Sequence, residues 1–244
     1  MSLHKVWFVL TVLLAVIGIH QWAYAQNITV DFINDAGSAA CAQKSGPSPL
    51  NISGPCGPIT LSATSTVSMI DGGSDYIRLY NAIITANSPV NNFRIIFKRQ
   101  HVQGPNTTAG PPVVDVSYKT TANGSFSPAT NGNSMTTTGY VANVPTDPQQ
   151  TMGSVSHTVS SGVGNFNKFS DKLWPRASQA ELSGDRILKV DVSFKLQTAT
   201  NTLNLTTGVK LYNAAPGDPG NGEGRGKGEN GNQENRNQTQ SRSE

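Results

Sequence analysis

The sequence is short of the side chains that enzymes use to transfer protons or attack substrates. It has only four histidines, and Glu181 is the only glutamate between residues 26 and 215. It contains no HExxH motif, no His-x-His pair and no GxSxG motif. These absences argue against a metalloprotease-type zinc site and against the nucleophile turn of the α/β-hydrolases. We therefore expect a protein that is not an enzyme and that holds no metal or cofactor.

Long apolar runs are also missing, apart from one at the N-terminus. Val6–Ile19 is apolar, follows Lys5 and precedes the small residues Ala23 and Ala25. This is the layout of a secretory signal peptide, and the run is shorter than the ~20 residues of a membrane-spanning helix. We predict a signal peptide at residues 1–25 and a secreted product, whether extracellular, periplasmic or at the cell surface. No transmembrane segment is expected in the mature chain.

Cysteine is scarce as well, because the chain has only Cys41 and Cys56, at the two ends of CAQKSGPSPLNISGPC. In an oxidising compartment an isolated pair is normally a disulfide. Two thiolates with no nearby histidine make a poor zinc site, and a redox pair favours the CxxC spacing. We predict a structural disulfide that stabilises the fold by about 3 kcal/mol in the chain-entropy model. The prolines and glycines of the loop argue against any regular element within it.

Only 14% of the residues are charged, and the formal net charge is +3. Removal of Lys5 with the signal peptide leaves 17 Lys and Arg against 15 Asp and Glu. This balance does not indicate nucleic acid as a partner. The densest basic cluster is KRQH at residues 98–101, which we interpret as the end of an edge strand kept soluble by its charges.

Residues 216–244 contain neither aliphatic nor aromatic side chains. Such a segment cannot bury the apolar surface that would offset its ordering entropy, so we predict a disordered hydrophilic C-terminal tail. Its charges alternate in sign, which is not typical of a nucleic-acid-binding arm. Residues 26–215 remain, and their length suits a single domain.

This central part contains repeated two-residue alternation of apolar and polar side chains. In RILKVDVSFKLQ, residues 186–197, the apolar side chains from Leu188 to Leu196 share one parity. The pattern recurs in ITLSATSTVSM, residues 59–69, and in TLNLTTGVKLYN, residues 202–213. Alternation of this kind predicts strands with one face inward and one face in water. Weaker candidates are residues 27–32, 76–85, 93–102, 113–121, 134–144 and 154–161.

Turn-forming sequences separate these segments, among them NSP at 87–89 and the NG pairs at 123–124 and 131–132. One short helix is expected at residues 173–182, with Pro175 near its start. Nine or ten strands with little helix predict an all-β fold. We expect an antiparallel β-sandwich of the jelly-roll or immunoglobulin-like type.

A glycosidase needs two carboxylates that face each other across a cleft. The candidates are Asp171, Glu181, Asp185 and Asp191. Asp191 alternates with apolar residues in a predicted strand and so lies on its polar face. The other three lie in a polar connector. We therefore interpret all four carboxylates as solvated or structural. The two carboxylates of DGGSD, residues 71–75, are too few for the roughly six to eight oxygens of a calcium site, and a turn is the simpler interpretation.

Trp174 is the only tryptophan after removal of the signal peptide, and Phe166 and Phe169 lie near it in a predicted connector. Aromatic rings offer flat apolar faces on which sugar rings can stack, which favours a carbohydrate-binding site. The same rings can instead cover the open end of a sandwich. The sequence leaves both interpretations open.

The favoured hypothesis is a secreted or surface-associated, non-enzymatic β-sandwich protein with a structural, adhesive or assembly role. Its partners would be other surface proteins, a second copy of itself or glycans. The alternative is a carbohydrate-binding module that uses the aromatic residues around Trp174, and an extracellular hydrolase is a third hypothesis. Six Asn-x-Ser/Thr sequons would carry glycans in a host with that pathway. They lie at Asn27, Asn51, Asn106, Asn123, Asn204 and Asn237.

Overall fold

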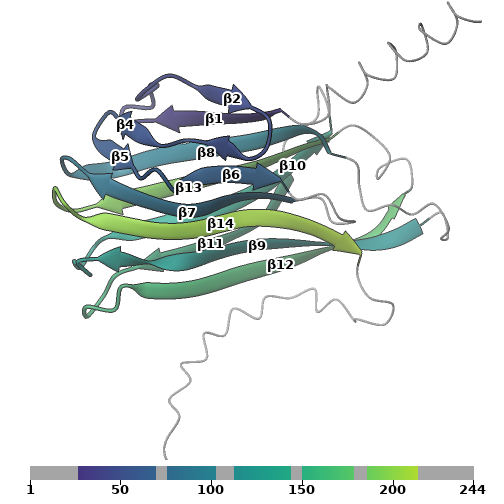
Figure 1. Cartoon of the computed structure of the whole chain (residues 1–244). Coiled ribbons are helices and arrows are strands. Elements are labelled where there is room, and N and C mark those ends of the chain that lie inside the picture. The colour runs from purple at the N-terminus through teal and green to yellow at the C-terminus, as the bar shows by residue number, and fades with distance from the viewer. Residues whose placement is uncertain (1–26, 70–75, 103–112, 144–149, 179–185, 214–244) are drawn as a thin grey trace, which may run out of the picture.

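The computed structural model describes residues 27–69, 76–102, 113–143, 150–178 and 186–213. Within these ranges the chain forms two antiparallel sheets that pack face to face, visible as two layers in Figure 1. The expected all-β antiparallel sandwich is therefore confirmed. No helix in these ranges is long and apolar enough to cross a membrane.

The first sheet, called sheet A, has the strand order β11-β10-β13-β8-β1-β2. In chain order its strands are β1 (Ile28–Ile33), β2 (Lys44–Gly46), β8 (Val90–Val102), β10 (Ser134–Asn143), β11 (Gln150–Thr158) and β13 (Arg186–Leu196). The short strands β1 and β2 lie at one end of the sheet, and β11 lies at the other.

The second sheet, called sheet B, has the order β12-β9-β14-β7-β5-β4, and β6 also pairs with β7 and with β3. Its strands are β3 (Leu50–Asn51), β4 (Gly54–Cys56), β5 (Ile59–Leu61), β6 (Thr66–Met69), β7 (Tyr76–Ala86), β9 (Val113–Ser127), β12 (Asn165–Ser178) and β14 (Thr202–Asn213). The short strands β1 to β6 therefore gather on the side of the sandwich next to β7 and β8 (Figure 1).

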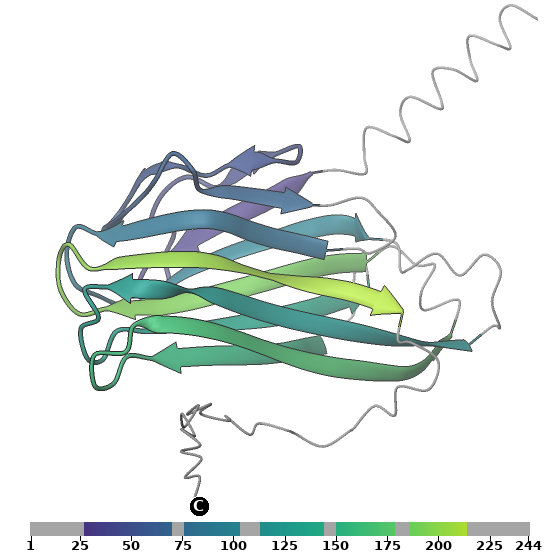
Figure 2. The ribbon, with the colours of Figure 1, turned by 60° about the horizontal axis from the view of Figure 1, so that its bottom comes forward.

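The eight long strands β7 to β14 pair in a nested pattern. β7 pairs with β14, β8 with β13, β9 with β12 and β10 with β11, as in one long hairpin matched from its open end to its turn. The hairpin is rolled up, so β9 also pairs with β14 and β10 with β13. Figure 2 shows β14 lying between β7 and β9 as a result. Two facing sheets connected in this way form a jelly roll, which decides between the two predicted sandwich types.

The core lies between the two sheets and follows the alternation of the sequence. On β13 the buried apolar side chains are Leu188, Val190, Val192, Phe194 and Leu196. Phe194 packs against Phe93 of β8, with ring centroids 5.4 Å apart. If the pairing of β13 shifted by one residue, every one of these apolar side chains would face solvent. Their burial therefore fixes the register of the strand.

The largest departure from the sequence-based expectation is β12. Residues 165–178 form a strand where the sequence predicts a connector and, from 173, a helix. The helix prediction is wrong for residues 173–178, and its last residues lie outside the described ranges. Among the described strands, β12 pairs only with β9, and its register shifts around Pro175. An edge strand tolerates a proline, and here Pro175 together with Lys168, a charge on the inward parity, hid the alternation.

The predicted disulfide between Cys41 and Cys56 is present, with Cα atoms 5.1 Å apart. Its loop does contain regular elements, contrary to expectation: β2, β3 and β4 are short strands within it. Each pairs with a strand outside the loop, β2 with β1, β3 with β6 and β4 with β5. These three strands, β12 and the division of residues 59–69 into two strands raise the number to fourteen among the described residues, against nine or ten predicted.

Three further local interpretations are wrong. Residues 59–69 form two strands, β5 and β6, rather than one. The Asn-Gly pair at 123–124 lies inside β9 and not in a turn. KRQH at 98–101 is not on a sheet edge, because β8 lies between β13 and β1, and Arg99 points into the protein, where it is buried.

The predictions for both chain ends fall outside the described residues. These are the signal peptide at 1–25 and the tail at 216–244. The turn proposed for DGGSD at 71–75 lies outside them as well.

Candidate functional site on the outer face of sheet B

Two of the three aromatic residues singled out in the sequence lie on opposite faces of β12. Phe166 is buried and packs against Phe126 and His157, with ring centroids 5.8 and 5.0 Å away. Phe169 is 65% exposed on the outer face of sheet B. The backbone of Trp174 pairs with β9 in the same strand, while its side chain is outside the described part of the chain. The structure therefore does not bring Phe166 and Phe169 together.

The candidate carboxylates are also apart. Asp171 is exposed on β12, with Oδ2 3.8 Å from Nζ of Lys119, whereas Asp191 belongs to β13 in the other sheet. Glu181 and Asp185 lie outside the described residues. Within the described ranges, no group of three or more His, Cys, Asp and Glu side chains could hold a metal ion.

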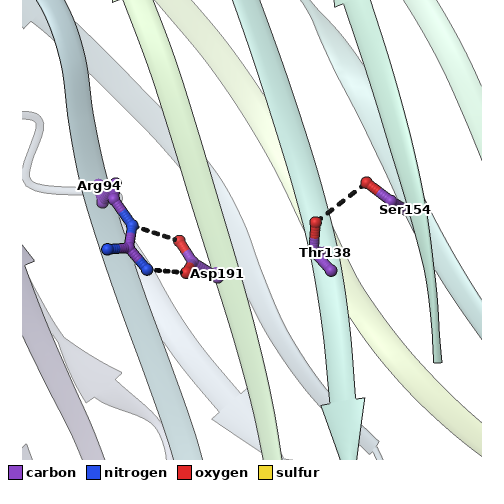
Figure 3. Close-up of polar contacts among 4 residues, drawn as sticks. All are labelled: Arg94, Thr138, Ser154 and Asp191. Carbon is purple, nitrogen blue, oxygen red and sulfur yellow. Dashed lines mark hydrogen bonds and ion pairs between the residues drawn. The ribbon is translucent and has the colours of Figure 1, made fainter. Parts of the chain in front are cut away.

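The outer face of sheet A pairs its polar groups with one another (Figure 3). Nε of Arg94 donates a hydrogen bond of 3.1 Å to Oδ1 of Asp191, and Nη2 contacts Oδ2. Asp191 is thereby covered to 8% exposure. The hydroxyls of Thr138 and Ser154 lie 3.0 Å apart on the neighbouring strands. Because these groups already have partners, this part of the face has little hydrogen-bonding capacity left for a ligand.

On sheet B, a β-bulge in β7 presents polar groups outward. The register between β7 and β14 shifts here, so Tyr80 and Asn81 together lie opposite Thr206. Asn81 takes the extra position with φ 47°, a conformation that asparagine tolerates better than most residues. Its backbone N–H donates to Oγ1 of Thr206 at 3.3 Å, and its carbonyl accepts from Oγ1 of Thr64 at 3.0 Å. The bulge leaves Asn81 exposed.

Beside the bulge lies a depression of about 540 Å³, lined by residues of β7, β14 and β9. A second hollow of about 510 Å³ adjoins it, shares Asn123 and Gly124 with it, and reaches β12. We call the combined surface the amide groove. Its main outward side chains are Asn81, Ile83, Asn123, Asn165, Asn167, Asn204 and Thr206.

The amide groove is lined by amides and hydroxyls, and none of its lining residues is charged. Nδ2 of Asn204 donates to Oγ of Ser125 at 3.3 Å, which orients one amide. Asn123 is exposed, and Ile83, 40% exposed, adds an apolar surface. A Cβ on Gly124 would overlap the carbonyl oxygen of Asn204, so glycine is needed at this point of the pairing between β9 and β14.

Next to the groove, β7 turns Tyr76, Arg78 and Tyr80 outward. The hydroxyls of Tyr76 and Tyr80 are hydrogen-bonded to each other, and burial raises the pKa of the Tyr76 phenol. Cζ of Arg78 lies 4.9 Å from the ring centroid of Tyr80. Its Nε is buried and has no hydrogen-bond partner among the described residues. Gly208 of β14 lies close to the backbone of β7 here, because a Cβ there would lie 2.4 Å from the carbonyl oxygen of Ile77 and 3.0 Å from Cβ of Arg78.

Two lysines continue this surface across the sheet. Lys210 of β14 pairs directly with Tyr76 on one side and with Lys119 of β9 on the other. Nζ of Lys119 lies 4.5 Å from the ring centroid of Phe169. Like charges directly opposite each other destabilise a sheet, so the Lys119–Lys210 pair is a local conflict. We define the basic aromatic platform as Tyr76, Arg78, Tyr80, Lys119, Phe169 and Lys210.

Parts of both surfaces can be recognised in the sequence. Tyr76 and Tyr80 lie four residues apart in the strand predicted at residues 76–85, which places them on one face, and both lie on the outward face of β7. In the sequence, Asn204 stands out only as a glycosylation sequon, and Asn123 as a sequon and as part of a predicted turn. The pairing of Asn204 with Ser125 and of Thr206 with Asn123 brings these two sequons side by side. No local motif indicates that pairing, so the groove was missed.

Comparisons with known proteins identify no family: no protein-family model and no curated protein matches this chain. Among solved structures it is similar to TmCBM61 in complex with beta-1,4-galactotriose, at 11% identity and a TM-score of 0.28, over 64% of this chain and 89% of that chain. It is similar to a CBM4 structure at 12% identity and a TM-score of 0.24, over 64% and 89%. The Eiger TNF from S. frugiperda aligns at 12% identity and a TM-score of 0.24, over 80% and 97%. At such low TM-scores these similarities carry no argument about function.

Proposed function

We propose that this chain is a secreted, non-enzymatic adhesive protein that binds a glycan in the amide groove. The observation that supports the proposal is the convergence of Asn81, Asn123 and Asn204 on one hollow. Each amide offers donors and acceptors together, which match the hydroxyls of a sugar ring. Ile83 offers an apolar contact for the C–H face of the ring. A hollow with a few convergent polar groups beside an apolar surface is the usual form of a ligand site.

The composition of the groove favours binding over hydrolysis. Hydrolysis of a glycosidic bond requires an acid and a second carboxylate on either side of it. The groove residues include neither, and the nearest described carboxylate on this face, Asp171, is paired with Lys119. Secretion is proposed from the signal-peptide pattern at residues 1–25, and the Cys41–Cys56 disulfide supports it, because such bonds persist in oxidising compartments.

The test is a glycan array followed by titration calorimetry with the best ligand, using full-length protein from a host without N-glycosylation. Asn123→Ala/Asn204→Ala removes two hydrogen-bonding amides, so affinity should fall about tenfold or more. The matched control is Asn91→Ala/Asn92→Ala, which removes two exposed asparagines from β8 and should leave affinity unchanged.

Two results would contradict the proposal. One is a protein that binds no glycan on the array. The other is a groove double variant that binds as tightly as the wild type while remaining folded by circular dichroism. In the second case Trp174→Ala tests the site suggested by the sequence, because loss of binding in that variant alone would move the site to Trp174.

A further inference from the structure

We infer that the glycan is acidic, and that its carboxylate or sulfate groups lie on the basic aromatic platform beside the amide groove. This inference rests on the proposed function and specifies the class of ligand. Arg78, Lys119 and Lys210 all face outward from sheet B. Among the described side chains of the platform and its strand neighbours, only Asp171 carries a negative charge, and it contacts Lys119.

The platform is placed to receive the same chain of sugars as the groove. It crosses β7, β14, β9 and β12, a distance of about 14 Å for strands ~4.8 Å apart. Tyr80 at one end precedes Asn81 of the groove in the same strand. At the other end Phe169 pairs with Thr121, two residues before Asn123. A glycan held by the amides therefore passes next to the cations and aromatic rings.

The chemistry of the platform suits an anion in particular. The planar guanidinium of Arg78, which lies over the ring of Tyr80, matches the two oxygens of a carboxylate or sulfate. Lys119 and Lys210 repel each other across the sheet, so the folded protein gains nothing from their pairing. An anion between them would remove that conflict. Local conflicts of this kind are expected at functional sites.

The experiment compares each charged polymer with its uncharged counterpart. Polygalacturonate and its fully methyl-esterified form test a carboxylate, and dextran sulfate and dextran test a sulfate. At low salt the full-length protein should bind at least one charged form about tenfold more tightly than its counterpart, and added salt should weaken that binding. Equal affinity for charged and uncharged forms of both polymers would overturn the inference.

A pair of charge-matched variants locates the effect. Lys119→Gln/Lys210→Gln should weaken binding of the charged polymer about tenfold and leave binding of the uncharged one unchanged. Lys98→Gln/Lys195→Gln removes two charges from the outer face of sheet A and should have no such effect. Equal losses of affinity in both double variants would overturn the inference. So would binding of single-stranded polythymidylate as tight as that of the charged polysaccharide, because it would indicate a general attraction of polyanions.

The outcomes separate this inference from the proposed function. Suppose that uncharged glycans bind, that Asn123→Ala/Asn204→Ala weakens this binding, and that the charge of the polymer makes no difference to affinity. Only the inference of an acidic glycan then fails. If charged polymers bind through Lys119 and Lys210 while the asparagine double variant has no effect, the amide groove is wrong as the binding site.

Discussion

His157 of β11 lies beside the rings of Phe126 and Phe166, with centroids 6.1 and 5.0 Å from its own. Burial lowers the pKa of its imidazole, and Lys168 lowers it further, while a hydrogen bond to the backbone of Val163 opposes them. In the unfolded chain the pKa returns to about 6.5. The folded protein therefore favours the neutral imidazole.

This difference makes stability depend on pH through His157. The stabilisation is present above the unfolded pKa and is lost as the pH falls through it toward the lower folded pKa. The free energy of unfolding, measured with urea, should decrease between about pH 7.5 and about pH 5.5. His157→Phe keeps a ring in place and should lose less over that interval. An equal decrease in the variant and the wild type would show that His157 is not the linked group.

The Arg94–Asp191 pair gives a second prediction about single residues. Removing Arg94 takes away the hydrogen-bonded partner of Asp191 but also uncovers its carboxylate to water, so Arg94→Ala should lower the free energy of unfolding by about 1 kcal/mol. In a double-mutant cycle with Asp191→Ala, we expect a coupling of only about 1 kcal/mol, because the Arg94 side chain is 37% exposed and solvent screens the pair. Strictly additive losses would mean that the pair contributes nothing. Glycan binding should not change, since the pair lies on sheet A.

Among the elements, the bulge of β7 links stability to the proposed site. Asn81 has a φ of 47°, which glycine adopts without strain and a β-branched residue does not. Asn81→Gly should therefore keep the bulge, whereas Asn81→Val should lower the free energy of unfolding by about 1–2 kcal/mol. Both variants lose the amide, so both should bind the glycan more weakly. Thermal unfolding and calorimetry measure the two effects separately. A valine variant as stable as the wild type would show that the bulge does not impose this backbone conformation.

The disulfide acts on the short strands rather than on the eight-stranded jelly roll. It fixes β4, and through it β5, to the segment that follows β1. Cys41→Ser/Cys56→Ser should lower the free energy of unfolding by about 3 kcal/mol, chiefly by freeing the unfolded chain. Urea unfolding of the oxidised wild type and the variant measures this difference. Identical unfolding midpoints and slopes would contradict a stabilising role.

Sequence alternation predicts strands where one face is apolar, and it fails where that contrast is weak. β13 was predicted nearly to its ends because its inward side chains are all apolar and its outward ones are mostly polar. β12 was missed because its outward face carries Phe169 and its inward parity includes Lys168, and because Pro175 interrupts the pairing. The strands of the disulfide loop have two or three residues each, too few to show a period.

At the scale of the whole molecule, the candidate site is a product of the strand order. Asn81, Asn123 and Asn204 come from strands far apart in the sequence, and they meet because β14 inserts between β7 and β9. Alternation shows which residues of a strand face outward, but it does not show which strands are neighbours. The sequence could therefore indicate an exposed Asn123 without indicating a groove.

The same strand order predicts how the chain tolerates shortening. β14 is an inner strand of sheet B, and it buries Leu203, Leu205, Val209 and Leu211. At about 2 kcal/mol for each buried side chain, its loss would remove stabilisation comparable to the whole free energy of folding of a typical domain, about 5–15 kcal/mol. A chain ending at Gln197 should therefore fail to fold.

A chain ending at Ala215 should behave differently, because the residues beyond it contain no aliphatic or aromatic side chain to bury. We expect its melting temperature and its glycan affinity to equal those of the full-length protein, measured side by side by calorimetry. A lower melting temperature would mean that residues 216–244 pack on the sandwich. An unchanged melting temperature with weaker binding would instead place part of the glycan contact in the tail, whose arginines and lysine would then add to the charge of the platform.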